Sequence, residues 1–240
     1  MAGQGIRARR RAEIEAAVVA AGRRQLAEVG AAALSVRAVA RDLDMASSAI
    51  YRYVSGRDEL LTLLIVTAYD ELADAVDAAL ARVDTSQLRA SFYAIGRSMR
   101  AWAIAHPHDH ALLFGSPVPH YRAPGDRTTA AGTRVPMRLA ALLRLPHESP
   151  PSGDPAALLA GAGAIAPIVG DPAMVPNSPA QPEVVQPEVV QRGLAAWTLL
   201  LGAINAEVFG YLGDDSISDP AAHFDTLLAL AVDLVTTAAL

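Results

Sequence analysis

Apolar residues recur at helical spacing through the first third of the chain and divide it into short segments. Over residues 10–29 an apolar stripe predicts an amphipathic helix, and Gly30 is a natural end for it. Ser35 is a suitable N-cap for a second helix, because an apolar face follows it at positions i, i+3, i+4 and i+7. The two stripes are Ile14, Val18, Ala21, Leu26 and Val29, and then Val36, Val39, Ala40 and Leu43.

A break at 44–47 separates the second helix from a third, which the pattern predicts over residues 47–54. Ser55 and Asp58 then form a capping-box pattern that opens a long helix to about Val83. At 1.5 Å per residue, that helix would run about 40 Å. It is long enough to connect the first three helices to the rest of the chain.

The rest of the chain also follows a helical pattern and contains one proline-rich interruption. Helices are predicted over about 86–105, 108–114, 126–145, 155–166, 191–212 and 219–239. Ten of the 16 prolines lie between Pro146 and Pro187, so the stretch 169–189 is predicted to be a mobile loop. It holds a tandem QPEVV copy at 181–190, which we interpret as a duplication tolerated in a loop. The fold class is therefore all-α, with residues 1–57 and 58–240 as its two domains.

Composition narrows the class of protein. The 240 residues are 52% hydrophobic and 19% charged, which is typical of a soluble globular protein. Cysteine is absent, which excludes disulfides and thiolate zinc sites. The longest apolar run, Gly193–Ile204, is shorter than the roughly 20 residues that span a bilayer. Charged residues follow the basic start RARRR, at the positions where a signal peptide would have its apolar segment. We expect a cytoplasmic protein with no membrane partner and no cofactor.

Charge is distributed unevenly along the chain. The net charge is −5, but all 20 basic residues are arginine and ten of them lie within residues 1–57. Five acidic residues share that stretch, which leaves it at +5 and the remainder at −10. Because salt screens charges beyond a Debye length of roughly 8 Å, DNA affinity depends on the facing surface and not on the whole chain. An acidic protein with a basic N-terminal domain is therefore compatible with DNA binding.

The second and third helices have the residue spacing of a helix-turn-helix. Counting from Val36, the fifth residue is small (Ala40), the ninth occupies the turn (Asp44) and the fifteenth is a buried aliphatic (Ile50). Glycine is usual at the ninth position, and Asp can adopt the left-handed conformation that a tight turn needs. With Met45, Ile50 and Val54 turned inward, the residues left for DNA on the third helix are Ser47, Ser48, Ala49, Tyr51, Arg52 and Tyr53. The alternative is a solvated helical hairpin.

The stretch SVRAVARDLDMASSAIYRYVSGRDELL resembles the DNA-binding domain of TetR-family transcriptional regulators. Departures from the family pattern are Asp44 for Gly, Ala46 for the usual capping Ser, and Tyr53 for His. The resemblance implies that Arg37 and the Ser47–Ala49 edge face bases. It also implies that Tyr51, Tyr53 and Arg57 hold phosphates of double-stranded operator DNA. Further on, WAIAHPHDHALLFGSPVPHYRAP resembles a TetR subgroup whose C-terminal domain is named for Trp, His and Gly, here Trp102, His106 and Gly115.

The segment HPHDH at 106–110 is one residue short of the H-x-H-x-D-H motif of metal-dependent hydrolases. That motif follows a strand, whereas a helical pattern precedes this segment. Pro107 favours a helix start with His106 at its cap, and His108 and His110 exposed or lining a pocket. We therefore expect no metal site and no catalytic residues. A metal-dependent hydrolase that uses His106–His110 stays as a minor alternative.

The family resemblance implies a helical effector-binding and dimerisation domain, and hence a repressor released by a small molecule. The candidate ligand-binding residues are apolar, which favours an apolar or amphipathic effector: Phe92, Met99, Trp102, Phe114, Met137, Ile165 and Trp197. The candidate homodimer interface follows stripes on the last two helices: Leu194, Leu201, Ile204 and Val208, then Phe224, Leu228, Ala231 and Val235. A DNA-binding dimer without an effector is the main alternative.

Overall fold

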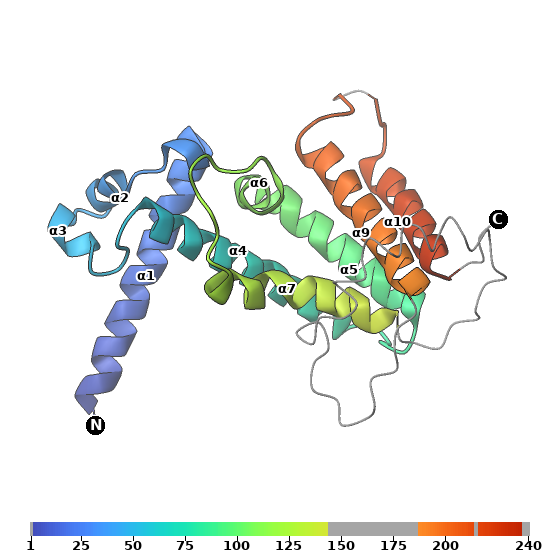
Figure 1. Cartoon of the computed structure of the whole chain (residues 1–240), viewed down its shortest axis with the longest axis horizontal. Coiled ribbons are helices and arrows are strands. Elements are labelled where there is room, and N and C mark those ends of the chain that lie inside the picture. The colour runs from blue at the N-terminus through green and yellow to red at the C-terminus, as the bar shows by residue number, and fades with distance from the viewer. Residues whose placement is uncertain (1, 144–186, 214–215, 237–240) are drawn as a thin grey trace. The chain divides into compact units, whose positions relative to one another are not determined.

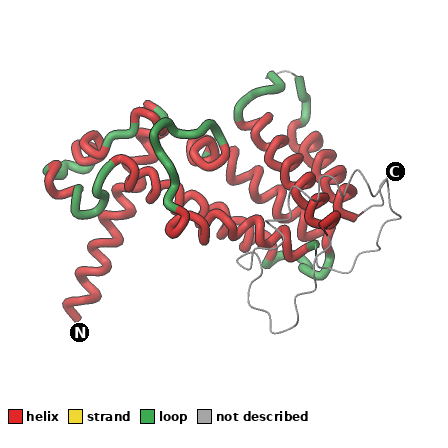
Figure 2. Tube along the Cα trace, in the orientation of Figure 1, coloured by secondary structure: helices red, strands yellow, loops and turns green. Residues whose placement is uncertain are grey.

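The structure, a computed structural model, describes residues 2–143, 187–213 and 216–236, and within them it contains helices and loops but no strand (Figures 1 and 2). The α-helices are α1 (Ala2–Val29), α2 (Val36–Asp42), α3 (Ser47–Ile50), α4 (Arg57–Leu80), α5 (Leu88–Ala105), α6 (Pro107–Phe114), α7 (Gly125–Leu142), α9 (Pro187–Val208) and α10 (Pro220–Thr236). A 3₁₀ turn, η1 (Ala31–Ala33), follows α1. The predicted all-α class is confirmed.

Contacts divide the chain into two compact units. Unit 1 consists of Met1–Ala73 and Ala103–Arg134, and unit 2 of Asp74–Trp102 and Val135–Leu240. The division falls within α4, α5 and α7, so it does not coincide with the predicted domain boundary at 57/58. That boundary describes a division of function and stays a prediction.

The core of unit 1 lies beneath the first three helices. Apolar side chains of α1, α2 and the start of α4 close around Ile50 of α3, which is fully buried. Burial of these side chains supplies the main driving force for folding, at about 25 cal/mol per Å² of apolar surface. The buried set includes Val18, Ala21, Leu26, Leu34, Val36, Val39, Ala40, Val54, Leu60, Leu61 and Leu64.

In unit 2, α10 packs along α9, and both pack against α5 through close contacts. A Cβ added at Gly96 of α5 would lie 2.3 Å from a methyl carbon of Leu228 in α10 and 3.4 Å from Leu200 in α9. Ion pairs at the rim connect the same elements, because Arg97 donates to Asp225 at 2.7 and 2.8 Å and Arg89 to Asp233 at 2.9 Å. Within the described ranges, no helix combines the length and hydropathy needed to cross a bilayer.

Several predicted element boundaries need correction. Helix α1 begins at Ala2 rather than near residue 10, and Val29 at its end is 53% exposed rather than inward. Helix α3 ends at Ile50, where turns replace the predicted continuation to Val54. Helix α4 begins at Arg57, so Gly56 rather than Ser55 precedes it.

The predicted loop at 169–189 is shorter at its C-terminal end, because α9 already begins at Pro187. The rest of that loop, most of the QPEVV copies and the predicted helix 155–166 lie outside the described residues. Helix α9 ends at Val208, four residues before the predicted end at Leu212, where a turn with Gly210 at φ 67° follows.

Candidate functional site

The tight turn of the helix-turn-helix lies at Asp44. Ser35 caps α2 by accepting a hydrogen bond from the Ala38 N–H at 3.4 Å, as predicted. At the other end the Met45 N–H donates to the Ala40 carbonyl at 2.9 Å. Asp44 between them has φ 51°, the left-handed region that favours glycine. The prediction that Asp takes the place of the usual turn glycine is confirmed.

Packing fixes the angle between α2 and α3. Ala40 is 1% exposed and Ile50 is fully buried, so a small residue of α2 admits the aliphatic residue of α3. Val54, 1% exposed, closes the far side, while Met45 is half-buried. Ala40, Ile50 and Val54 therefore serve packing, and the exposed side chains of α2 and α3 are available to a partner.

The side chains predicted to contact DNA differ in exposure. Arg37, Ser47, Ser48 and Arg52 are exposed, as is Tyr51, while Ala49 and Tyr53 are half-buried. Small hydroxyl residues at the start of a short helix fit the major groove, and arginine and tyrosine reach phosphates or base edges. The arrangement is that of a DNA-reading surface with few strong base-reading groups apart from Arg37.

Arg57 has a structural contact that the sequence did not indicate. Its Nη2 donates to the carbonyls of Ala31 and Ala32, at 3.0 and 3.1 Å. These carbonyls end the 3₁₀ turn η1, so Arg57 connects the start of α4 to the end of α1. A phosphate contact by Arg57, which stays a prediction, would have to use its remaining N–H groups.

Arg23 likewise serves the fold rather than DNA. Its Nη atoms donate to both carboxylate oxygens of Glu71 in α4 at 2.6 and 2.9 Å, and its Nε lies 2.9 Å from Asp109 in α6. Burial raises the pKa of Asp109, and the charge of Arg23 opposes that rise. Arginines 9 and 10 are exposed on α1, so part of the predicted positive charge does face solvent.

The histidine cluster has a structural role. His106 occupies the N-cap of α6 and Pro107 its first position, as predicted. His108 is exposed, but His110 is 1% exposed, with its ring centroid 5.2 Å from that of Phe114. The expectation that His110 is exposed or lines a pocket therefore needs correction. Within the described part of the chain, no group of three or more metal-ligating side chains comes together.

Two of the three residues that suggested the W-H-G subgroup are explained by close packing. Trp102 is 6% exposed. Gly115 ends α6, where an added Cβ would lie 2.4 Å from the carbonyl oxygen of Ala111. Only glycine accommodates that approach without moving the backbone.

The predicted ligand-binding residues that the structure describes are not among those lining the cleft of unit 1 or the cavity between α9 and α10 described below. Phe92, Met99 and Trp102 are buried in the interior of unit 2. Phe114, Met137 and Trp197 are half-buried, and Ile165 lies outside the described residues. Their role in binding an effector stays a prediction.

Unit 1 contains a cleft of about 540 Å³ between α4, α6, the 115–123 segment and α7. Sequence reasoning missed it, because residues from a loop and two distant helices form it. The lining residues are Ile65, Tyr69, Leu112, Leu113, Gly115, Ser116, Pro117, Val118, Tyr121, Ala123, Thr128, Thr129, Gly132 and Thr133. Burial raises the pKa of Tyr69, so its phenol stays neutral there. A second cavity, in unit 2 between α9 and α10, is smaller, about 220 Å³.

The residues predicted for the dimer interface are mostly part of the interior of unit 2. Ile204, Phe224, Leu228, Ala231 and Val235 are at most 4% exposed in the single chain. They fill its own core and cannot also form a surface for a second copy. Leu194, Leu201 and Val208 are half-buried. Exposed residues of these helices include Leu230 and Leu234 on α10, and Ala195, Thr198 and Gly202 on α9.

A packed helix-turn-helix with an exposed polar face defines a DNA-binding regulatory protein. Two family models match the chain: bacterial regulatory proteins, tetR family, over residues 18–64, and Tetracyclin repressor-like, C-terminal domain, over residues 92–231. The chain therefore belongs to the TetR family of transcriptional regulators, and it is not an enzyme. The matches do not confirm the W-H-G subgroup, which stays a prediction.

Relatives and solved structures agree with this assignment. HTH-type transcriptional regulator Rv1816 of Mycobacterium tuberculosis and HTH-type transcriptional regulator Mb1846 of Mycobacterium bovis are each 43% identical over 235 residues, 92% of either chain. The crystal structure described as that of regulatory protein SCO4313 has a TM-score of 0.70 and 28% identity, over 93% of this chain and 97% of that one. The TetR family transcriptional regulator PfmR from Thermus thermophilus, at TM-score 0.50 and 15% identity over 91% and 96%, shows the same fold.

Proposed function

We propose that this protein is a transcriptional repressor that binds palindromic operator DNA as a homodimer and is released by a small apolar or amphipathic effector. The observation that carries the proposal is that one compact unit holds both an exposed DNA-reading surface and an unfilled cleft of about 540 Å³. Cavities of 300–1,000 Å³ are typical of small-molecule sites. The protein would act in the cytoplasm, where its DNA is, and needs no cofactor.

The exposed faces of α9 and α10 support the homodimer. Leu230 and Leu234 are 51% and 42% exposed and lie one turn apart on α10. On α9, a Cβ added at Gly202 would meet nothing within 4 Å, so this small residue leaves room for a partner. Two copies would present two α3 helices to half-sites about one DNA turn, roughly 34 Å, apart or slightly farther.

Release would follow from a shift between conformations. The two conformations differ in the spacing of the two α3 helices, and only one of them fits both half-sites. An effector that binds the other conformation more tightly lowers the affinity for operator, and the ratio of its two affinities limits the size of the effect. The effector need not touch DNA.

Selection of DNA from a random library by the purified full-length chain tests the proposal. We expect the enriched sequences to share an inverted repeat. We also expect expression of a reporter gene under control of the selected operator to fall when the protein is produced. Recovery of unrelated sequences only, with affinity set by salt alone, would contradict the proposal.

One observation favours the alternative, a DNA-binding dimer without an effector: Phe92, Met99 and Trp102 fill the interior of unit 2 rather than line a cavity. Adding a compound library to the protein–operator complex separates the two functions. Release by at least one compound supports the effector, and release by none supports the alternative.

A further inference from the structure

The cleft of unit 1 has walls without charged side chains. Its lining consists of aliphatic and aromatic residues, of serine, threonine and tyrosine hydroxyls, and of glycine, alanine and proline. A buried charge needs a partner, and a charged ligand would find no counter-charge among these residues. The walls therefore favour an uncharged ligand.

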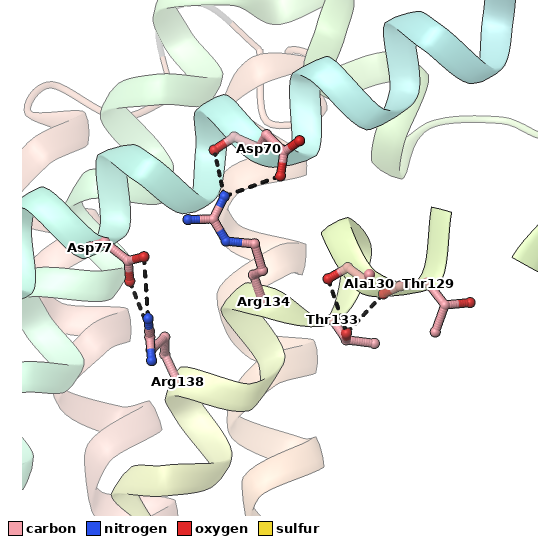
Figure 3. A network of polar contacts seen from close by, with 7 residues as sticks. All are labelled: Asp70, Asp77, Thr129, Ala130, Thr133, Arg134 and Arg138. Carbon is pink, nitrogen blue, oxygen red and sulfur yellow. Dashed lines mark hydrogen bonds and ion pairs between the residues drawn. The ribbon is translucent and has the colours of Figure 1, made fainter. Parts of the chain in front are cut away.

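Two arginines close to the cleft in sequence, Arg127 and Arg134, pair with carboxylates of α4. Arg134, which follows the lining residue Thr133, donates to a carboxylate oxygen of Asp70 at 3.1 Å (Figure 3). Arg127, just before Thr128, bonds both oxygens of Glu59 at 2.7 Å. These pairs join the first half of α7 to α4, so two walls of the cleft are held together by ion pairs.

Two threonine hydroxyls of α7 in the lining, those of Thr128 and Thr133, offer a ligand an acceptor because their hydrogens are already used. Thr133 donates to the carbonyl of Thr129 at 2.8 Å (Figure 3), and Thr128 donates to that of Pro124 at 3.0 Å. A hydroxyl whose hydrogen is used in this way still has a lone pair to offer. A ligand with an N–H or O–H group can donate a hydrogen bond to these hydroxyl oxygens.

The third wall, the 115–123 segment with the end of α6, also packs against the core that supports the helix-turn-helix. Leu112, Val118 and Tyr121 line the cleft, and the same three side chains pack against the core of α1, α2 and α4. The Tyr121 hydroxyl lies 2.9 Å from that of Thr62 in α4, whose own hydrogen goes to the Asp58 carbonyl at 2.8 Å. Tyr121 is therefore the donor to Thr62, two turns from the start of α4.

This third wall contains a strained backbone position. It is a loop, and His120 within it has φ 60°, a conformation that costs free energy for a residue with a Cβ. A ligand that displaces Tyr121 would break its bond to Thr62 and disturb the packing beneath the helix-turn-helix.

We propose that the cleft binds an uncharged, mainly apolar molecule with a hydrogen-bond donor, and that its occupancy acts on the helix-turn-helix through the 115–123 segment and the Tyr121–Thr62 bond. The binding part stands on the cleft alone. The coupling part rests on the proposed function.

The fluorescence of N-phenylnaphthylamine, a neutral aromatic amine, tests the binding part with the full-length protein. Thr133→Phe fills the cleft and should weaken binding by more than about tenfold. Ala130→Phe, on the exposed side of the same helix and outside the cleft, should leave it unchanged. Thr129→Phe is a second cleft-filling variant should Thr133→Phe fail to fold. Equal binding by the cleft-filling and Ala130→Phe variants would overturn the site.

Anilinonaphthalene sulfonate, which has the same rings plus a sulfonate, tests the preference for uncharged ligands. This probe also binds exposed apolar surfaces. Only the part of its fluorescence that Thr133→Phe removes is therefore compared with that of the neutral probe. At the cleft we expect it to bind more weakly than the neutral probe by about tenfold or more. Equal affinity would overturn the assignment of ligand class.

Operator affinity with and without the neutral probe tests the coupling. We expect saturating probe to lower the operator affinity of the unsubstituted protein. The Tyr121→Phe variant should bind the probe with unchanged affinity, but its operator affinity should respond much less to the probe. Tyr93→Phe, which removes a hydroxyl from α5 in unit 2, should keep the response. A full effect in Tyr121→Phe would overturn the coupling route. If no operator binds at all, the proposed function and the coupling fail together, while the fluorescence result still decides the site.

Discussion

At the scale of single residues, Asp44 shows how a turn tolerates an unusual side chain. Its φ of 51° is left-handed, and it is exposed, so its carboxylate stays hydrated. The conformation costs roughly 1–2 kcal/mol for a typical residue with a Cβ and less for Asp, which visits this region more readily. The turn is therefore held against a local preference by the burial of Ile50 and Val54.

Asp44→Gly should raise the free energy of unfolding by about 0.5 kcal/mol, because the strain it removes exceeds the extra chain entropy of glycine. Asp44→Ala should lower it by about 1 kcal/mol, since alanine tolerates the left-handed region less well. Urea unfolding of both variants measures the difference. A stabilised Asp44→Ala would contradict the account.

Arg37 is the strongest candidate for reading a base. Arg37→Ala should lower affinity for the selected operator by about 1–3 kcal/mol and for unrelated DNA by much less. Arg52→Ala is the matched variant and should weaken both by similar amounts, as loss of a phosphate contact does. Fluorescence anisotropy at fixed salt measures all four affinities. Equal losses for Arg37→Ala would make it a phosphate contact instead.

Gly115 gives a prediction about backbone packing. Gly115→Ala places a Cβ 2.4 Å from the Ala111 carbonyl, and the shift this forces should cost about 2 kcal/mol of stability. Gly125→Ala is the control, because its Cβ would meet Thr129 Oγ1 at an ordinary 3.5 Å and should change stability by less than about 0.5 kcal/mol. Thermal unfolding compares the two, and similar midpoints would refute the packing argument.

At the scale of helices, Arg23 is the point where α1, α4 and α6 meet. It is 26% exposed, while its partner Asp109 is only 6% exposed and Glu71 is 40% exposed. Loss of the guanidinium leaves the buried Asp109 carboxylate with only His106, 4.0 Å away, as an ion-pair neighbour, whereas the more exposed Glu71 can be solvated by water. The contact thus matters mainly for α6, the helix that carries one wall of the cleft.

Arg23→Met should destabilise the protein by about 3 kcal/mol at neutral pH. With Arg23 gone, burial and the negative charge of Glu71 raise the pKa of Asp109 further above the ordinary 3.8, and His106, 4.0 Å away, is the remaining group that opposes the rise. A carboxyl with a raised pKa in the folded state holds its proton more tightly there, so stability is lost as pH rises through that pKa. The deficit of the variant should therefore shrink as pH falls.

Urea unfolding at about pH 8 and about pH 5 measures this dependence. Arg11→Met is the control, since Arg11 and Glu15 are 64% and 38% exposed, and it should change stability by less than about 0.5 kcal/mol at either pH. A deficit that does not vary with pH would show that Asp109 is not its cause.

Helix existence and type could be predicted from the sequence because apolar stripes, Ser35, Gly30 and Pro107 are local signals. The turn at Asp44 followed from the spacing of Ala40 and Ile50. The contacts of Arg57 could not be predicted, since they depend on carbonyls at Ala31 and Ala32 that only folding brings near. The cleft was missed for the same reason, because Tyr69 and Thr133 lie 64 positions apart in sequence.

At the scale of the whole molecule, the proposed homodimer would form through the last two helices. An apolar stripe in a sequence does not tell which side faces the chain's own core and which faces a second copy. The burial of Leu228 and the exposure of Leu230 and Leu234 separate the two sides. The proposed interface therefore uses residues adjacent to those that the stripe indicated.

Leu230→Glu combined with Leu234→Glu should convert the dimer to a monomer, because two carboxylates would be buried without partners. The monomer should keep its helical content and lose most operator affinity, since each half-site alone binds weakly. Sedimentation equilibrium gives the mass and circular dichroism the fold. Ala221→Glu, at an exposed position near the start of α10 and on the side of the helix opposite Leu230, is the control and should remain dimeric. A doubly substituted protein that stays dimeric would rule out this face.

The attachment of α7 to α4 has a consequence for how the protein can change over evolution. Ion pairs through Arg127 and Arg134 hold this part of α7 in place, whereas Thr129 and Thr133 face the cleft. The arginines that attach α7 are therefore different residues from the threonines that would contact a ligand. Under the proposed function, mutation at the threonines would alter which molecule is recognised while the fold is kept, so related regulators could diverge in the molecule they bind and still bind the same operator.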